Sequence, residues 1–404
     1  MKILIYHQYF ISRDGAGGTR TYENGKALIE AGHSVTVVCG SGHSGLVSDY
    51  KNGVRSGSVD GIQVIQFDTK YSNYQSIPRR ALSFFSFILR SSHLIFTLDY
   101  DLIFATSTPL TIGIPGILAK ILRRKCFVFE VRDLWPELPK AMGIITNPIA
   151  LGGLSMLEYL IYHSADRMIG LSGGMVEGIV RRGIAGDKVA LLPNGCDLRL
   201  FDTSGVVLKE DLFDADDFVV IFAGAHGIAN GLDNIINTAA YLQDLGEIQI
   251  KFLFIGDGNC KQGLIADVES RDLKNCTFLP PMPKHEVGNY FMIADVGLQA
   301  LKNIPEFYNG TSPNKLYDYM AAGLPIIINY PGEGAQVITT NNSGIAVSPD
   351  NPAALGDALI LLKNNPSMVI EMGLASRRVA VEKFDRKKIS QSWVSWVTEG
   401  VVDE

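Results

Sequence analysis

The stretch NGTSPNKLYDYMAAGLPIIINY, residues 309–330, has the form of a helix that ends at a glycine and runs into an apolar strand. Ser312 is a favoured N-cap residue and Pro313 a favoured first helical residue, so they predict a helix start. Gly323 suits the left-handed residue that ends a helix, and residues 324–330 are apolar enough for a buried strand. The stretch therefore predicts one helix–strand unit of an α/β fold.

The same alternation of strand-like and helix-like segments runs along the whole chain, which predicts parallel β-α-β units. A polar, acidic segment near residues 197–217 interrupts it, after which it begins again. We therefore predict two doubly wound, Rossmann-like domains facing each other, over residues 1–200 and 205–380. A last helical segment, residues 381–404 with Trp393 and Trp396, is expected to pack back on the first domain. The predicted strands are residues 2–7, 34–40, 102–107, 126–131, 167–172, 189–195, 217–225, 248–258, 277–281, 295–301 and 324–330; the predicted helices are 19–32, 112–122, 231–244, 312–322 and 386–402.

Composition limits the class of protein. The chain has 404 residues, 47% of them hydrophobic, with a formal net charge of -6, which argues against a nucleic-acid-binding surface over the whole protein. Its five cysteines are dispersed without a CxxC pair, as in reduced, intracellular proteins. We find no signal-peptide pattern and no run of about 18 apolar residues.

The start of the helix at Ser312 is suited to a phosphorylated ligand. Free N–H groups at a helix amino terminus attract anions, and Lys315 adds a full positive charge in the first turn. Asp318 is three residues further on and shares that face, where it can accept hydrogen bonds from vicinal hydroxyls of a ribose. Phosphate and ribose together describe a nucleotide. The alternative is an ordinary Lys–Asp pair on the surface of a capped helix.

Three other loops follow predicted strands, where doubly wound folds bind ligands. The first contains Gly17 and Gly18, with Thr19 able to cap the next helix; the second contains His226 and Asn230; the third contains Gly256. Glycines there permit close approach of a ligand, although they are equally typical of turns. The chain lacks both GxGxxG and GxxxxGK[ST], so these loops are weak evidence by themselves.

Two acidic features have side chains suited to catalysis or metal binding. Asp133, in EVRDLWPE after the strand that ends at Val131, could serve as a catalytic base or bind an acceptor hydroxyl, or belong to a salt-bridged turn. The Asp99–Asp101 DYD sequence precedes its strand and lies at the wrong edge of the sheet for a metal site. The seven histidines show no metal-binding spacing, and His7 and His163 are expected to be structural.

Two segments combine apolar and basic residues, as membrane-surface helices do. One is RRALSFFSFILRSSHLIFTL, residues 79–98, and the other is AKILRRKCF, residues 119–127. The alternative is a pair of ordinary domain helices with a solvated basic rim.

Taken in order, several motifs give the chain a family resemblance. It resembles the retaining glycosyltransferases of family 4, which have the GT-B fold, and especially their bacterial branch for O-antigen and capsule repeat units, which includes N-acetyl-L-fucosamine (L-FucNAc) transferases. The motifs are GAGGTRTYENGKALIEAGHSVTVV, VRDLWPE, LSGGM, LLPNGCD, GAHGIANGLDNII, FIGDGN and GTSPNKLYDYMAAGLPIII.

The resemblance implies transfer of an N-acetylamino or deoxy-amino hexose from a UDP-sugar to a polyprenyl-diphosphate-linked saccharide. The enzyme would work at the inner face of the cytoplasmic membrane, without a metal or cofactor. The family's E-x7-E motif ends on the ribose-binding acid, here Asp318, whereas its first acid falls on Gly310 and is replaced by Glu306 nearby. The usual diphosphate-binding Arg and Lys are missing, so Lys315 takes their role.

Asp133 stands roughly where many family members place a histidine. The predicted catalytic residues are therefore Asp133, Glu306 and Lys315. The predicted donor-binding residues are Gly17, Gly18, His226, Asn230, Gly256, Ser312, Asn314, Lys315 and Asp318.

Two other functions remain open from the sequence. A UDP-sugar 2-epimerase shares the two-domain fold, and a non-catalytic sugar- or lipid-binding protein could retain half of the motif. A dinucleotide oxidoreductase is less favoured because its glycine fingerprint and following acid are absent.

Overall fold

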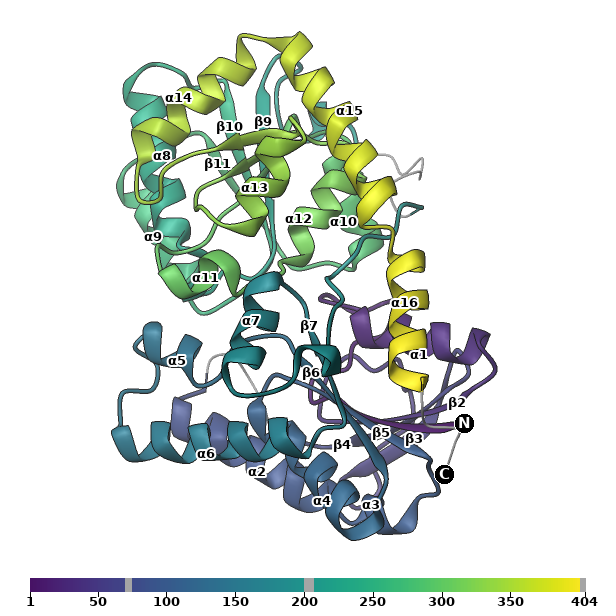
Figure 1. Ribbon diagram of the computed structural model, residues 1–404. Coiled ribbons are helices and arrows are strands. Elements are labelled where there is room, and N and C mark those ends of the chain that lie inside the picture. The colour runs from purple at the N-terminus through teal and green to yellow at the C-terminus, as the bar shows by residue number, and fades with distance from the viewer. Residues whose placement is uncertain (70–74, 200–206, 400–404) are drawn as a thin grey trace. The chain divides into compact units, whose positions relative to one another are not determined.

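The computed structural model describes residues 1–69, 75–199 and 207–399 and divides into two compact units (Figure 1). Unit 1 comprises Met1–Pro193, Gly310–Ser312 and Lys387–Glu404, and unit 2 comprises Asn194–Asn309 and Pro313–Arg386. Each unit is an α/β layer structure built on a largely parallel sheet, so the predicted fold class of two Rossmann-like domains is confirmed.

Unit 1 contains a sheet with strand order β3-β4-β2-β1-β5-β6-β7-β8, parallel except for the antiparallel edge strand β3. The strands β1 and β5–β7 consist mostly of apolar residues because helices cover both faces of the sheet. The bounds are β1 (Lys2–Tyr6), β2 (Ser34–Cys39), β3 (Val54–Val59), β4 (Ile62–Phe67), β5 (Leu102–Thr106), β6 (Cys126–Val131), β7 (Arg167–Gly170) and β8 (Val189–Leu191).

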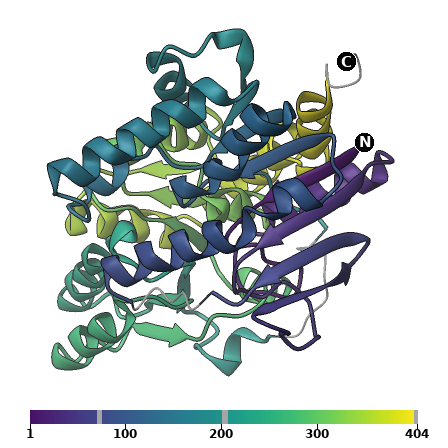
Figure 2. The same ribbon diagram turned by 90° about the horizontal axis from the view of Figure 1, so that it is seen from below.

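One face of this sheet is covered by α2, α3, α4 and α6, which share a core cluster with the strands. Figure 2 views the molecule from the side of these helices, with α2, α4 and α6 crossing in front of the sheet in dark blue to teal. The other face carries α1, α7 and α16, with Trp393 fully buried against Phe104. The bounds are α1 (Arg20–Glu30), α2 (Ile77–Ser91), α3 (Leu94–Thr97), α4 (Ile114–Arg123), α5 (Glu137–Ala141), α6 (Pro148–Ser164), α7 (Gly173–Arg181) and α16 (Arg386–Thr398), with short 3-10 turns η1 (Leu110–Gly113) and η2 (Gly186–Lys188).

Unit 2 contains a parallel sheet with strand order β11-β10-β9-β12-β13-β14. Its core joins the strands to α8, α9, α14 and α15. The bounds are β9 (Phe218–Ala223), β10 (Ile250–Ile255), β11 (Cys276–Leu279), β12 (Val296–Gln299), β13 (Ile326–Ile328), β14 (Gly344–Ala346), α8 (Leu232–Asp244), α9 (Lys261–Ser270), α10 (Lys284–Phe291), α11 (Pro305–Asn309), α12 (Asn314–Ala321), α13 (Glu333–Thr340), α14 (Pro352–Lys363) and α15 (Pro366–Lys383), with η3 (Lys209–Asp211) and η4 (Ile228–Asn230).

The β3–β4 hairpin and the helix α6 are among the elements absent from the predicted pattern. The hairpin turns at Asp60 and Gly61, both with positive φ, and an Asp-Gly pair is a recognised hairpin signal. The helix α6 is capped by Asn147, whose side chain accepts from the backbone N–H groups of Ile149 and Ala150. The predicted last helix, 386–402, is observed as Arg386–Thr398, and residues 400–402 lie outside the described residues.

Candidate functional site

The helix α12 begins later than predicted. Its N-cap is Pro313 and its first residue Asn314, so the prediction that Ser312 caps this helix is wrong. Pro313 is in extended conformation, which places Ser312 one residue before the cap. The predicted helix end is confirmed, since Ala322 is the C-cap and Gly323 follows it with a φ of +71°.

Lys315, in the first turn of α12, points toward the end of β9. Its Nζ donates to Oδ1 of Asn230 at 2.7 Å and lies 4.5 Å from the centre of the Phe222 ring. The Asn230 amide is fixed because its Nδ2 donates to the Ala225 carbonyl at 2.7 Å. Among the described residues, no carboxylate forms an ion pair with Lys315, and burial lowers its pKa to about 7. A half-buried amine whose partners among the described residues are neutral is suited to an anionic ligand.

Asp318, one turn further along α12, has a different partner. Its Oδ1 lies 2.6 Å from Nζ of Lys284, at the start of α10, and both side chains are largely buried. Within the part of the chain that the structure describes, no hydrogen bond is directed at this oxygen, so the contact is an ion pair that leaves Asp318 able to accept further hydrogen bonds. The alternative of a Lys315–Asp318 surface pair is therefore wrong, because each of the two residues pairs elsewhere.

The loops that follow β9 and β10 are in close contact. A Cβ on Gly256, whose φ is +142°, would lie 1.9 Å from the carbonyl oxygen of Gly224. His226 is fully buried, with its ring 6.0 Å from the centres of both the Phe222 and Phe278 rings. Burial lowers the pKa of His226 to about 4, so this ring is neutral at pH 7. Close packing accounts for Gly256, whereas both ring nitrogens of His226 are buried without a hydrogen-bond partner among the described residues, so its role in donor binding stays a prediction.

The remaining predicted residues of this region lie close to α12 in the sequence. Asn314 is the first residue of α12 and is half-buried, as is Ser312. Glu306 is exposed in the first turn of α11. The structure thus brings Lys315 and Asn230 into direct contact and places Glu306, the predicted substitute acid, on a separate short helix.

Gly17, Gly18 and Asp133 belong to unit 1. Gly17 has a φ of +143° and is exposed in the loop before α1. Asp133 is half-buried after β6, and burial raises its pKa to about 6. Its neighbour Arg132 contacts the Nε2 atom of buried His7 at 3.2 Å. A carboxyl group with a pKa near neutrality at a strand's carboxyl end is suited to accept a proton or a hydroxyl hydrogen bond.

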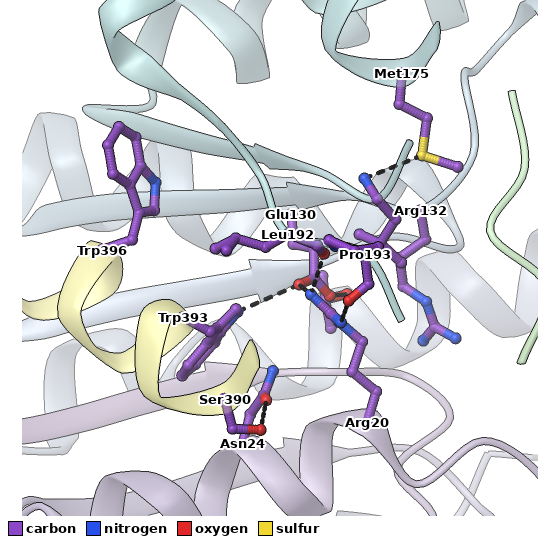
Figure 3. A network of polar contacts seen from close by, with 12 residues as sticks. Arg20, Asn24, Glu130, Arg132, Met175, Leu192, Pro193, Ser390, Trp393 and Trp396 are labelled. Atoms are coloured by element: carbon purple, nitrogen blue, oxygen red, sulfur yellow. Dashed lines mark hydrogen bonds and ion pairs between the residues drawn. The ribbon is translucent and has the colours of Figure 1, made fainter. Parts of the chain in front are cut away.

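Arg20 and Glu130 form a buried ion pair in unit 1 (Figure 3). Arg20 donates through Nε and Nη2 to Oε2 of Glu130 at 3.0 and 2.8 Å, and through Nη1 to the Pro193 carbonyl at 2.7 Å. Trp393 of α16 donates to the same carboxylate oxygen at 3.3 Å. Arg20 and Glu130 therefore join α1, β6, the segment that leaves unit 1 and the helix that returns to it.

Lys284 and the pairing of Arg20 with Glu130 were not predicted from the sequence. Lys284 follows Pro283 at a helix start after a strand, and that position was the available signal. Arg20 and Glu130 are 110 residues apart in the sequence, so their pairing had no local signal.

Sequence and structure comparisons identify the family. Residues 15–195 match the glycosyl transferase 4-like domain, and residues 208–379 match the glycosyl transferases group 1 domain. The chain therefore belongs to the group 1 glycosyltransferases of family 4, with the GT-B fold.

Among curated relatives, WcaI of Escherichia coli (strain K12), a proposed glycosyl transferase of colanic acid biosynthesis, is 24% identical over 245 residues, covering 58% of this chain and 57% of that protein. The chain spans about half the length of the curated relatives it matches.

Among solved structures, sucrose-phosphate synthase from Thermosynechococcus elongatus superposes with a TM-score of 0.73 at 20% identity, covering 97% of both chains. Anabaena Alr3699/HepE in complex with UDP superposes with a TM-score of 0.70 at 17% identity, covering 98% of this chain and 99% of that chain. These two likenesses concern the fold.

Proposed function

We propose that this glycosyltransferase moves a sugar from a UDP-sugar to a polyprenyl-diphosphate-linked saccharide in O-antigen or capsule synthesis, with retention of configuration. An N-acetylamino or deoxy-amino hexose such as L-FucNAc is the proposed sugar. The proposal depends chiefly on Lys315, a half-buried amine at the start of a helix in the group 1 domain that pairs with no carboxylate among the described residues. A nucleoside diphosphate is the donor group that such a site would stabilise as it leaves.

The choice of donor and pathway is supported by similar proteins. Anabaena HepE has been solved with UDP and with UDP-glucose, which favours a uridine nucleotide for this chain. WcaI, assigned to colanic acid biosynthesis, and WaaG, involved in lipopolysaccharide biosynthesis, favour a role in a bacterial surface polysaccharide.

In the proposed reaction, Lys315 and the amide groups that begin α12 stabilise the departing diphosphate. The acceptor hydroxyl attacks from the same face, and a β-phosphate oxygen takes its proton. Asp133 then serves as the ligand that orients the acceptor hydroxyl, and Glu306 contacts the donor sugar. The reaction on this account needs no metal and no strong protein base.

The first test is nucleotide binding to the wild type and to Asp318→Ala, measured by calorimetry without metal. We expect UDP to bind more tightly than GDP, ADP or CMP, and Asp318→Ala to weaken UDP binding by about 10- to 100-fold, since a charged hydrogen-bond acceptor is lost. Asp267→Ala, an exposed acid of α9, is the control and should bind as the wild type does. Equal binding by Asp318→Ala and the wild type would contradict the ribose assignment.

Two other functions have distinct signatures. A UDP-sugar 2-epimerase would convert the donor without an acceptor, whereas a transferase would release UDP faster when a lipid-linked saccharide is added. A non-catalytic binding protein would show neither activity and no slow hydrolysis of the donor.

A membrane-facing surface is proposed on unit 1. We name the exposed apolar residues of α2, α3, α4 and α6 the apolar face; they are Ile77, Leu82, Phe85, Leu89, Phe96, Ile121, Leu122, Ile149, Met156, Tyr159 and Leu160. The helices that carry them are neighbours, since α4 packs against α6 and η1 contacts both α2 and α6. Exposed Arg79 and Arg124 belong to the same helices or their ends, which matches an anionic bilayer surface. No helix among the described residues is long and apolar enough to cross a bilayer.

Liposome flotation tests this surface. We expect the wild type to float with vesicles that contain anionic lipid, and Arg79→Glu/Arg124→Glu to reduce the bound fraction several-fold, since each cation near such a surface contributes about 1 kcal/mol. Leu89→Ser should weaken binding as well, because Leu89 is 82% exposed. Leu374→Ser, at a 68% exposed leucine of α15 in unit 2, is the matched control. Unchanged flotation of both unit 1 variants would exclude this surface.

A further inference from the structure

The ion pair between Lys284 and Asp318 has features of a binding site in its own right. The two residues come from different helices, α10 and α12, and their charged atoms are 2.6 Å apart. The side chains of Lys284 and Asp318 are only 14% and 11% exposed. Both charges have therefore lost most of their water, which is costly unless further partners complete their hydrogen bonding.

Neither member of the pair is saturated by the described contacts. Oδ1 of Asp318 is buried, and the Lys284 contact is not aligned as a hydrogen bond. An ammonium group has three N–H donors, and a carboxylate has about four acceptor positions. The pair consequently offers donors and acceptors side by side, on the face of α12 that carries Lys315 one turn earlier.

A hydroxyl group is the complement of such a pair. It donates its proton to a carboxylate and accepts from an ammonium through its oxygen, so one hydroxyl satisfies both charges. Vicinal hydroxyls provide two such oxygens at a fixed separation. An inorganic phosphate would be repelled by Asp318, and an amine would be repelled by Lys284.

We propose that Lys284 is a second ribose ligand, acting with Asp318 so that the site distinguishes ribonucleotides from nucleotides without ribose hydroxyls. This inference rests on the proposed function, because it assumes that a nucleoside diphosphate binds at α12. The sequence predicts that Asp318 alone binds the ribose, and the inference adds Lys284 of α10 as a second ribose ligand. The diphosphate remains with Lys315 and the helix amino terminus.

The experiment compares UDP with 2′,3′-dideoxy-UDP by calorimetry on the same proteins. For the wild type we expect UDP to bind at least tenfold more tightly than the dideoxy nucleotide, because charge-assisted hydrogen bonds are lost with the hydroxyls. Lys284→Met should weaken UDP by about tenfold but leave the dideoxy nucleotide nearly unchanged. When Asp318→Asn is already present, adding Lys284→Met should reduce the preference for UDP over the dideoxy nucleotide only slightly further.

Two further variants separate binding from folding. Lys284→Arg keeps the charge and should retain part of the preference for UDP, while thermal melting reports whether Lys284→Met is folded. Lys363→Met breaks a comparable Lys–Glu pair on α14 of unit 2 and should leave both affinities unchanged.

Three results would contradict the inference or its premise. If Lys284→Met weakened the binding of UDP and of dideoxy-UDP equally, Lys284 would serve the phosphates or the fold. If the wild type bound the two nucleotides with equal affinity, the site would not recognise the ribose hydroxyls. If the wild type bound no nucleotide, the proposed function itself would fail.

Discussion

Replacing Lys315 with methionine is expected to abolish nucleotide binding and, at the same time, to raise the melting temperature of unit 2. Methionine fills similar space against Phe222 without a buried charge. The Lys315 amine has an ordinary pKa of 10.5, and burial lowers this pKa to about 7. The folded state therefore disfavours the charge, by a few kcal/mol on the linkage scale of 1.36 kcal/mol for each pKa unit.

The size of the gain is limited by what methionine leaves behind. Oδ1 of Asn230 loses its donor, which costs about 1–3 kcal/mol, so we expect a net rise of about 2–6 °C in the unit 2 transition. We expect the affinity for UDP to fall at least 100-fold, since a desolvated charge contact to the diphosphate is lost. Differential scanning calorimetry and titration calorimetry measure the two effects on one sample.

The pH dependence of binding gives a separate test of the same amine. Between pH 7 and 10.5 the unfolded state binds a proton that folded Lys315 lacks, so this residue makes the free protein more stable as the pH rises. A bound diphosphate restores the charge, and UDP should then bind with proton uptake at pH 8. The calorimetric enthalpy of UDP binding to the wild type at pH 8 should differ between HEPES and Tris buffers, and equal enthalpies in the two buffers would mean that no proton is taken up.

Lys363→Met is the control for these effects, because Lys363 is paired with Glu247 and lies on α14. It should lower the melting temperature or leave it unchanged, with normal UDP affinity. A Lys315→Met variant that melted lower and still bound UDP would contradict the assignment of Lys315 as a buried anion ligand.

Loss of Glu130 is expected to have the largest effect on stability. Glu130→Ala leaves Arg20 buried without its carboxylate and removes the acceptor of Trp393, so we expect the free energy of unfolding of unit 1 to fall by about 3–5 kcal/mol. Replacing both partners, as Arg20→Met/Glu130→Leu, should cost less than Glu130→Ala alone, because no charge is left unpaired. Urea denaturation of the single and double variants gives the coupling between the two side chains.

The contribution of Glu130 to the stability of unit 1 should also depend on pH. Burial opposes the charge of Glu130, but Arg20, with help from Arg132 and Thr106, holds the pKa of Glu130 below its ordinary 4.5. This contribution is fully present above pH 4.5 and is lost as the pH falls through the lower folded-state pKa. Glu130→Ala should therefore lose part of the acid sensitivity of the wild type.

Asp99→Ala is the matched control for the ion pair. Asp99 is also paired with a cation in unit 1, Lys2, but the Lys2 and Asp99 side chains are 56% and 76% exposed. Water can replace either partner, so we expect a loss well below that of Glu130→Ala. If the two variants lost similar amounts of unfolding free energy, burial would not be what makes the Arg20–Glu130 pair costly to break.

The sequence was a good guide wherever the signal is local. Apolar runs predicted the parallel strands because strands buried on both faces need mostly apolar residues, as in β1 and β5. Gly323 predicted the end of α12 because its left-handed conformation favours glycine. The N-cap at Ser312 failed because propensity does not fix the exact start of a helix when the following proline is itself extended.

By itself, the sequence determined the two doubly wound sheets, the family and the helix that carries Lys315 and Asp318. The tertiary structure decided which groups these two side chains meet: Asn230 and Phe222 for Lys315, and Lys284 for Asp318. It likewise decided that Arg20 meets Glu130. The reason is physical, since backbone preferences and apolar periodicity act over a few residues, whereas the partner and burial of a charge depend on segments that only packing brings together.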